Sequence, residues 1–390
     1  MNQSLSFDTD LDVAVIGAGY AGSLVALKAT EIGLRVGVFD IRPEYPDHFR
    51  AEKLEPDQHE TLERLGFIDL IRPVDSPYID RVNVFTGKKR RVVTCRKHRG
   101  MDYQGTVNSF RDALRSRELL HIRKIETLQD AEDHCAIVFE DGAAVRTRLA
   151  VVATGGSKLA RSALGLAAPG NEAWISTSFG FYVEPTAEDG FRFDAFNAVP
   201  DRFIEGLHYC TFFPIGGRTR VNIFSCWHPS SGEVRSLRTD PVGVLREMFP
   251  ELERHSGPFR LSGKVRVFTT RYYRQQVQHL SSVILVGDEF QSVSPATGMG
   301  ISKCVTDAEA AVRVLAGLPK SRGLPLNLEA FLHDPRKIQV DEMARHRWEW
   351  ANELATSRSL TTRLRKLKRA LSAKVSQLSA PILECGLDRV

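Results

Sequence analysis

The feature that most constrains the fold of this chain is a glycine-rich turn near its N-terminus. The turn follows a short apolar run over residues 13–16 and precedes a helical pattern over 20–32. It consists of Gly17-Ala18-Gly19-Tyr20-Ala21-Gly22. In this spacing the first glycine permits a tight turn, the second lets a pyrophosphate approach the backbone, and the third allows close helix–strand packing. The start of the helix adds free N–H groups and a positive dipole end.

The segment that follows this helix supports the same interpretation. A second apolar strand over 35–39 ends in Asp40, and Ile41 and Arg42 come directly after it. An acidic residue about 20 positions beyond such a turn can hold the hydroxyl pair of a ribose. The strand, turn, helix and second strand therefore predict a dinucleotide site. A purely structural glycine turn is the alternative, because the spacing by itself also arises by chance.

A second glycine-containing turn lies near residue 287. An apolar strand over 283–286 is followed by Gly287 and Asp288, and a loop rich in Pro and Gly then enters a helix that extends to about 317. The loop and the start of this helix contain Pro295, Gly298, Met299, Gly300 and Ile301. With the first turn, this segment resembles the flavin-dependent aromatic hydroxylases, the group A monooxygenase superfamily related to para-hydroxybenzoate hydroxylase.

The resemblance implies FAD as the cofactor and assigns roles to these residues. Asp288 would bind the ribityl chain, whereas Gly298, Met299 and Gly300, with Ile301 after them, would line the isoalloxazine. The carbonyl of Pro295 would face the substrate ring. A helix N-terminus aimed at the pyrimidine edge of the flavin would stabilise the negative charge of its reduced form.

Other segments extend the resemblance, and one departs from it. Arg42 matches an acidic-x-Arg strand end, Arg50 would contact the FAD phosphate or ribityl group, and Gln104 would touch the flavin. A guanidinium suits a phosphate better than the point charge of a lysine does. The departure is Ala153-Thr154-Gly155. The hydroxylases usually carry Ala-Asp-Gly there, and its aspartate takes part in FAD and NAD(P)H binding.

Because of this departure, the mode of flavin reduction stays open. The Ala-Thr-Gly run is more similar to flavin halogenases and geranylgeranyl reductases than to most of the hydroxylases. NAD(P)H is the expected electron donor, and a separate flavin reductase is the alternative.

The element pattern predicts an α/β fold. Alternating strands and helices indicate a Rossmann-like FAD-binding domain, and β-rich stretches inside it indicate an inserted antiparallel-sheet substrate domain. The expected FAD-binding domain is discontinuous and comprises 1–78, 96–165 and 276–320. The expected substrate domain comprises 79–95 and 166–275, and a helical C-terminal region covers 321–390.

Composition and spacing exclude several classes of protein. The net charge of +5 over 390 residues gives no reason to expect nucleic acid as a partner. The cysteines and histidines show neither Cys-x-x-Cys nor His-Glu-x-x-His spacing, so no metal site is expected. The N-terminus is polar and acidic, and no apolar run approaches the roughly 18 residues of a membrane span. We therefore expect a soluble, cytoplasmic protein.

The resemblance implies a monooxygenase that hydroxylates or epoxidises a small organic substrate through a flavin C4a-(hydro)peroxide. The oxidant is carried by the cofactor, so the sequence names no catalytic residue of the protein. Aromatic residues of the β-rich part could line an apolar pocket, which favours an apolar or aromatic substrate; they are Phe179, Phe181, Tyr209, Phe212 and Phe213. A flavin-dependent halogenase, a geranylgeranyl-reductase-like enzyme and a non-redox FAD-binding protein are the alternatives.

Residues 358–374 form a basic segment near the C-terminus. They carry seven basic residues and no acidic one, and leucines recur at helical spacing. A helix that docks its leucines on the protein explains this pattern. The alternative is a basic amphipathic helix that binds a membrane surface or an acidic carrier protein presenting the substrate.

Overall fold

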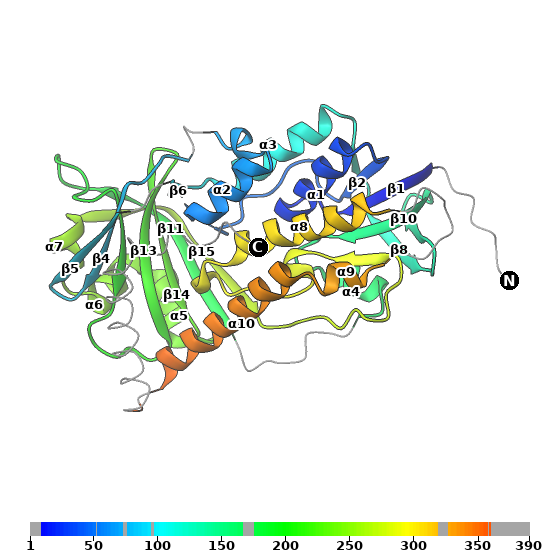
Figure 1. Cartoon of the computed structure of the whole chain (residues 1–390). Helices are drawn as coiled ribbons and strands as arrows, with labels where there is room; N and C mark the ends of the chain where they lie inside the picture. Colours follow the sequence, from blue (N-terminus) through cyan, green and yellow to red (C-terminus); the bar gives the residue numbers. More distant parts are fainter. Residues whose placement is uncertain are drawn as a thin grey trace, which may run out of the picture.

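The computed structural model describes residues 9–51, 53–72, 76–94, 97–166, 175–318, 327–357 and 359. In this part of the chain, two large β-sheets lie at opposite ends of an elongated molecule (Figure 1). Helices cover both sheets, and one long helix runs from the first sheet toward the second (Figure 1). The mixed α/β fold predicted from the sequence is confirmed.

The first sheet is mainly parallel. Its strands are β1 (Thr9–Ile16), β2 (Val36–Asp40), β7 (Leu120–Ile122), β8 (Ile125–Asp130), β9 (Cys135–Phe139), β10 (Ala144–Val152) and β16 (Val283–Leu285). The order is β7-β2-β1-β10-β9-β8, and β16 pairs in parallel with the last residues of β10. Only β8 and β9 introduce antiparallel pairing among these described strands. A strand from late in the chain thus completes a sheet begun at the N-terminus.

Both faces of the central part of this sheet are buried, which explains the apolar runs at the ends of β1 (residues 13–16) and β10 (residues 149–152). Val13 and Val15 of β1 pack with the helices on one face, whereas Ala14 and Ile16 belong to the cluster on the opposite face. The helices of the first sheet are α1 (Tyr20–Glu31), α2 (Pro56–Arg64), α3 (Tyr103–Arg115), α4 (Lys158–Ala163), α8 (Gly300–Ala316) and α9 (Glu329–Leu332). Helix α1 packs against both α3 and α8 over β1.

The second sheet contains the β-rich stretches that the sequence predicted. Its strands are β4 (Arg81–Thr86), β5 (Lys89–Thr94), β11 (Ile175–Pro185), β12 (Ala195–Val199), β13 (Leu207–Ile215), β14 (Arg218–Ser225) and β15 (Phe259–Arg271). The order is β15-β11-β14-β13-β12-β4-β5. All its pairings are antiparallel except that of β12 with β4.

Shorter elements complete the described fold. Unpredicted helices cover one face of the second sheet, namely α5 (Gly232–Thr239), α6 (Pro241–Met248) and α7 (Leu252–Ser256). A small ribbon joins β3 (Lys53–Leu54) to β6 (Arg99–Gly100). Three 3-10 turns are η1 (Ile68–Leu70), η2 (Gly287–Glu289) and η3 (Pro295–Thr297).

Helix α10 (Pro335–Thr356) links the two sheets. Its start packs against α8, and at its other end the carbonyl of Ala355 accepts a hydrogen bond from the N–H of Gly206, 2.9 Å away, just before β13. The basic segment 358–374 lies outside the described residues apart from Ser359. No described helix combines the length and apolar character required to span a bilayer.

A buried ionic cluster fastens α10 to α8. Lys303 contacts Asp307 at 3.0 Å, and Lys337 contacts Asp341 at 2.7 Å, with all four side chains at most 1% exposed. Lys303 also binds Asp341, so the charges alternate around the cluster. Asp307 accepts a hydrogen bond of 2.7 Å from the N–H of Gly287, so the cluster also holds the turn after β16.

Candidate cofactor site

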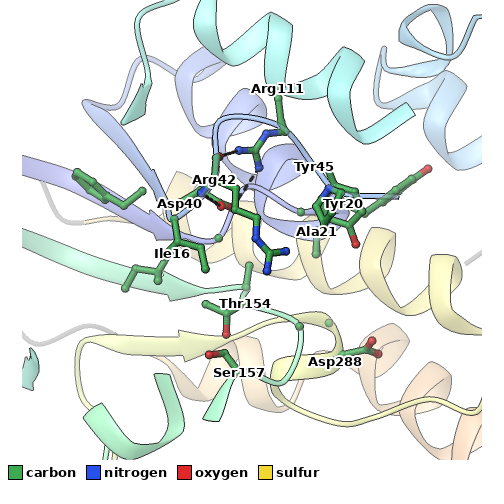
Figure 2. Close-up of a pocket in the computed structure, with 18 of the residues that line it drawn as sticks. Ile16, Tyr20, Ala21, Asp40, Arg42, Tyr45, Arg111, Thr154, Ser157 and Asp288 are labelled. Atoms are coloured by element: carbon green, nitrogen blue, oxygen red, sulfur yellow. Dashed lines mark hydrogen bonds and ion pairs between the residues drawn. The ribbon is translucent and has the colours of Figure 1, made fainter. Parts of the chain in front are cut away.

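A cavity of about 390 Å³ opens where the carboxyl ends of β1, β2, β10 and β16 meet (Figure 2). This is the edge at which open parallel sheets bind ligands. Most of the residues predicted from the two motifs line it, namely Gly17, Gly19, Tyr20, Ala21, Asp40, Ile41, Arg42, Arg50, Ala153, Thr154, Gly155, Gly287 and Asp288. The structure therefore brings together segments that are far apart in the sequence.

The three glycines of the first turn differ in what surrounds them. Gly17 has φ +99°, and a Cβ there would lie 2.6 Å from the carbonyl oxygen of Ala153. A Cβ at Gly22 would collide with the carbonyl of Gly17, so Gly22 serves the packing of α1 on β1. At Gly19, in contrast, a Cβ would meet no described atom nearer than 3.9 Å. The protein itself does not require glycine there, but a phosphate placed against that backbone would.

Two helix N-termini are open to a ligand at this edge. Helix α1 has Gly19 as its N-cap and α8 has Met299, and neither receives a side-chain capping bond from a described residue. A Cβ at Gly300 would meet no described atom within 4 Å. Free N–H groups at helix starts attract anionic and electron-rich groups. The residues present thus fit a long ligand that carries a pyrophosphate.

The loop before α8 follows the cavity residues Gly287 and Asp288 in the sequence, but its own residues do not line the cavity. Gly298 adopts a left-handed conformation with φ +68° and is exposed, as is Gly300. The side chain of Met299 turns toward α10, and that of Ile301 joins the main core. This segment offers a ligand mainly backbone groups. Pro295, which begins η3, is half-buried.

Asp40 closes one end of the cavity. Its carboxylate accepts hydrogen bonds from the N–H of Ala18 at 2.8 Å, the N–H of Arg42 at 3.0 Å and Nη1 of Arg111 at 3.2 Å. Arg111 is 1% exposed and also donates to the carbonyls of Ala18 and Pro43. The side chain of Arg42 extends into the cavity (Figure 2). This end is fixed by the protein before any ligand binds.

Arg50 and Asp288 form the other end. Nη1 of Arg50 lies 2.8 Å from Oδ2 of Asp288, although the two residues are 238 positions apart. Nε of Arg50 is buried and has no hydrogen-bond partner among the described residues. The hydroxyl of Tyr273 donates to the backbone carbonyl of Asp288. Burial raises the pKa of Tyr273, so this hydroxyl keeps its proton.

The departure at Thr154 has a structural counterpart in Glu289. The hydroxyl of Thr154 binds the Glu289 carboxylate, and the N–H of Gly156 donates to the same oxygen at 2.9 Å. Glu289 is fully buried, and this burial raises its pKa. A carboxylate therefore does reach the first loop, but it comes from the turn after β16 and bonds to the loop from behind the cavity.

Gln104 does not line the cavity. Its Nε2 donates to the carbonyl of Tyr45 at 3.1 Å and so supports the loop after β2. The contact of Gln104 with the flavin stays a prediction, and this hydrogen bond gives the side chain a role in supporting the loop. Ala18 and Gly22 also lie behind the cavity surface, in the turn itself.

Several cavity residues had no signal in the sequence. Tyr45 and Tyr103 form an aromatic side with Tyr20, and Cys304 lies near Gly287. Burial raises the pKa of Cys304 to about 12, so its thiol stays neutral and is no nucleophile at neutral pH. In the described part of the chain, no three His, Cys, Asp or Glu side chains gather into a metal site.

The comparisons with known proteins agree with this geometry. A sequence model of the family described as "FAD binding domain" matches residues 10–339. The chain therefore belongs to this family. The predicted cofactor, FAD, is confirmed.

Individual relatives are distant. The chain is 30% identical to squalene epoxidase erg1 of Schizosaccharomyces pombe over 97 residues, which cover 25% of this chain and 21% of that protein. The match thus spans about a fifth of the curated relative. The fold is similar to p-nitrophenol 4-monooxygenase PnpA of Pseudomonas putida, with TM-score 0.68, 19% identity and 92% of each chain covered. It is also similar to the flavin-dependent brominase Bmp2, with TM-score 0.65, 16% identity, and 89% and 85% of the chains covered.

Proposed function

We propose that this chain hydroxylates or epoxidises a small organic substrate, with FAD as cofactor and NAD(P)H as electron donor. The observation that carries the proposal is the contact of the second sheet with the loop after Asp288. The hydroxyl of Tyr209 donates to the carbonyl of Ala296 at 2.9 Å, and Ser294 bonds to Ser176 on β11 at 2.9 Å. A substrate held by this face of the sheet would therefore lie beside the loop that precedes α8.

We assign the cavity to FAD, with the pyrophosphate at Gly19 and the start of α1, a ribose at Asp40, and the ribityl chain at Asp288. Arg42 and Arg50 supply positive charge along it. The loop from Pro295 to Ile301 would receive the isoalloxazine through its backbone. When bound, FAD supplies the transfer of electrons from NAD(P)H and the activation of oxygen. The protein's own residues bind, orient and exclude water.

One face of the second sheet lies toward the loop that precedes α8. The aromatic residues of the sheet predicted an apolar wall on this face, but not all of them lie on it. Phe179, Phe181 and Phe212 point to the opposite face, where they pack under α5 and α6 with at most 1% exposure. Tyr209 and Phe213 do lie on the side of the loop, because alternate residues of a strand face opposite ways.

Polar side chains share that face. The register places Thr211 opposite Asn222, between Tyr209 and Phe213 on β13, and the two side chains bond at 3.3 Å. On β11, Ser178 has a buried hydroxyl without a partner among the described residues. The wall is therefore mixed, and it suits an aromatic substrate that also carries hydrogen-bonding groups.

The test is to purify the yellow protein and measure its anaerobic reduction by NADH and by NADPH, with and without candidate aromatic substrates. Oxygen is then admitted, and the masses of the products are measured by mass spectrometry. A mass gain of one oxygen supports the proposal. A halide-dependent gain of bromine or chlorine, a gain of hydrogen, or a product without net redox change would replace it with one of the alternatives. Reduction only after addition of a flavin reductase would move the electron donor to a separate protein.

Two further proposals concern organisation and partners. We propose that 1–78, 96–165 and 276–320 form the FAD-binding domain, that 79–95 and 166–275 form the substrate domain, and that 321–390 is a helical C-terminal region. We also propose that the basic segment 358–374 binds an acidic carrier protein or membrane surface that presents the substrate. Reversing its charges should lower turnover of carrier-bound substrate and leave turnover of the free form unchanged.

A further inference from the structure

Two loops meet at the back of the cofactor cavity. One is 153–157, directly after β10, and the other is η2 with its neighbours, directly after β16. The two strands are parallel neighbours, with Val152 opposite Leu285, so their carboxyl ends reach the same edge. Thr154 and Gly155 face the cavity from the first loop, and Asp288 faces it from the second. What holds these loops at their spacing therefore shapes the cofactor site.

Glu289 is the side chain that joins them. It belongs to the second loop and is 0% exposed, yet its carboxylate bonds to the first loop, at the hydroxyl of Thr154 and at the N–H of Gly156. Its remaining oxygen, Oε1, is buried and has no hydrogen-bond partner among the described residues. Glu289 itself does not line the cavity. It acts from behind the surface that a ligand would touch.

The first loop depends on this contact for its shape. Gly155 and Gly156 both have positive φ, +73° and +91°. Because glycine has no Cβ, the backbone at these two positions could adopt many other conformations. The buried carboxylate gives the loop a fixed acceptor for two of its donors. Burying a carboxyl group is unfavourable unless it is hydrogen-bonded, and an apolar side chain would fill the same space without that penalty. A purely space-filling role therefore does not explain a glutamate here.

A cation and an aromatic ring, Arg161 and Tyr273, lie close to the contact between Glu289 and the first loop. The positive charge of Arg161 on α4 acts on Glu289, and the guanidinium of Arg161 lies over the ring of Tyr273, 5.2 Å from its centroid. Tyr273 in turn donates to the backbone of Asp288. Tyr273 thus connects Arg161 on α4 with the turn that carries Asp288 and Glu289.

We infer that Glu289 is a positioning residue of the FAD site, which sets the spacing between the Thr154 loop and the Gly287–Asp288 turn and thereby controls how tightly FAD is retained. This inference depends on FAD binding in the cavity and is independent of the reaction that the holoenzyme performs. Failure of the proposed monooxygenase activity would leave it intact.

The test compares FAD affinity among variants of the full chain, by titrating FAD into deflavinated protein and following the quenching of flavin fluorescence. Glu289→Ala leaves two partly buried donors of the first loop without an acceptor, so the dissociation constant should rise about 10- to 100-fold. Thr154→Val removes one of the two bonds and should raise it several-fold. Glu289→Gln keeps an acceptor oxygen in place and should remain within about threefold of the wild type.

Leu315→Ala is the matched control. This side chain is 1% exposed near the far end of α8, so its loss should lower the melting temperature of the deflavinated protein without changing FAD affinity. Wild-type affinity in both Glu289→Ala and Thr154→Val would overturn the inference. It would equally be overturned if Leu315→Ala weakened FAD binding as much as Glu289→Ala does, or if Glu289→Gln bound FAD as poorly as Glu289→Ala. If Glu289→Ala does not fold, the FAD affinity of Thr154→Val decides, and wild-type affinity in that variant would overturn the inference.

Discussion

The two ends of the cofactor cavity are built in different ways. At the Asp40 end, one carboxylate already accepts three hydrogen bonds, two of them from the backbone of its own strand–turn–helix unit. At the Asp288 end, Arg50 and Asp288 meet across 238 positions, and their side chains are still 24% and 30% exposed. The first end is rigid before a ligand arrives. The second keeps unused hydrogen-bonding capacity and is completed by what binds there.

The largest expected effect comes from filling the space beside α1. Gly19→Val should reduce FAD affinity about a thousandfold, roughly 4 kcal/mol, because its side chain occupies the position of the pyrophosphate. The backbone there has φ −80°, and a Cβ meets no described atom nearer than 3.9 Å, so the protein should still fold. The measurements are flavin content and circular dichroism. In contrast, Gly22→Val should destabilise the fold itself, because its Cβ collides with Gly17.

The next largest effect tests whether the Asp40 end is held by Arg111. Arg111→Met removes the buried guanidinium and should lower the free energy of unfolding by about 3 kcal/mol, since Asp40 loses one of its three donors and several backbone carbonyls lose theirs. Denaturant titration of the deflavinated protein measures this loss. Arg115→Met, one helical turn away and one-third exposed, is the control and should change stability by less than about 1 kcal/mol. If Arg111→Met and Arg115→Met were equally stable, Arg111 would not be what holds the Asp40 end in place, and the proposed difference between the two ends would be wrong.

A smaller effect is expected at the Asp288 end, and it should appear in binding rather than in stability. Asp288→Ala should weaken FAD binding by about 2 kcal/mol, or roughly 30-fold, through loss of a charged acceptor for the ribityl chain. Asp288→Asn should lose less, because it keeps an acceptor oxygen. Flavin-to-protein absorbance ratios after gel filtration measure retention. Full retention by Asp288→Ala would contradict the assignment of this turn.

The smallest effect concerns pH. Burial raises the pKa of Glu289 above its usual value of 4.5, against the opposing hydrogen bonds of Thr154 and Gly156 and the charge of Arg161. The stability that the protonated carboxyl contributes is fully present below pH 4.5 and is lost as the pH rises through the raised pKa. Glu289→Gln cannot ionise. Its melting temperature should therefore rise relative to that of the wild type as the pH increases above 4.5, and a constant difference between the two proteins would show that Glu289 does not titrate in that range.

The parts of the site that the sequence predicted are those fixed by local geometry. Gly17, Gly19 and Asp40 belong to one strand–turn–helix–strand unit, and Gly287 and Asp288 belong to another, so spacing alone locates them. Arg111 and Glu289 could not be predicted in this way. Each acts through a contact between distant segments, and nothing in the local sequence distinguishes them from surface charges.

The faces of the second sheet show the same limit. Phe212 and Phe213 are neighbours in an apolar run, and only the register of β13 against β14 decides which one faces the helices α5 and α6. Alternation reveals the buried face when the other face is polar. Here both faces of β13 are covered, so the sequence predicted a strand but not its orientation.

The pairing of β16 with β10 has a consequence for the order in which the protein is made. A nascent chain that has reached residue 275 already contains every described strand of the second sheet, yet it lacks β16, Asp288 and the start of α8. The first sheet, which begins with β1, therefore cannot be completed until β16, the last described strand, has left the ribosome. We therefore expect FAD to bind only after this late closure, when the second sheet has already been synthesised.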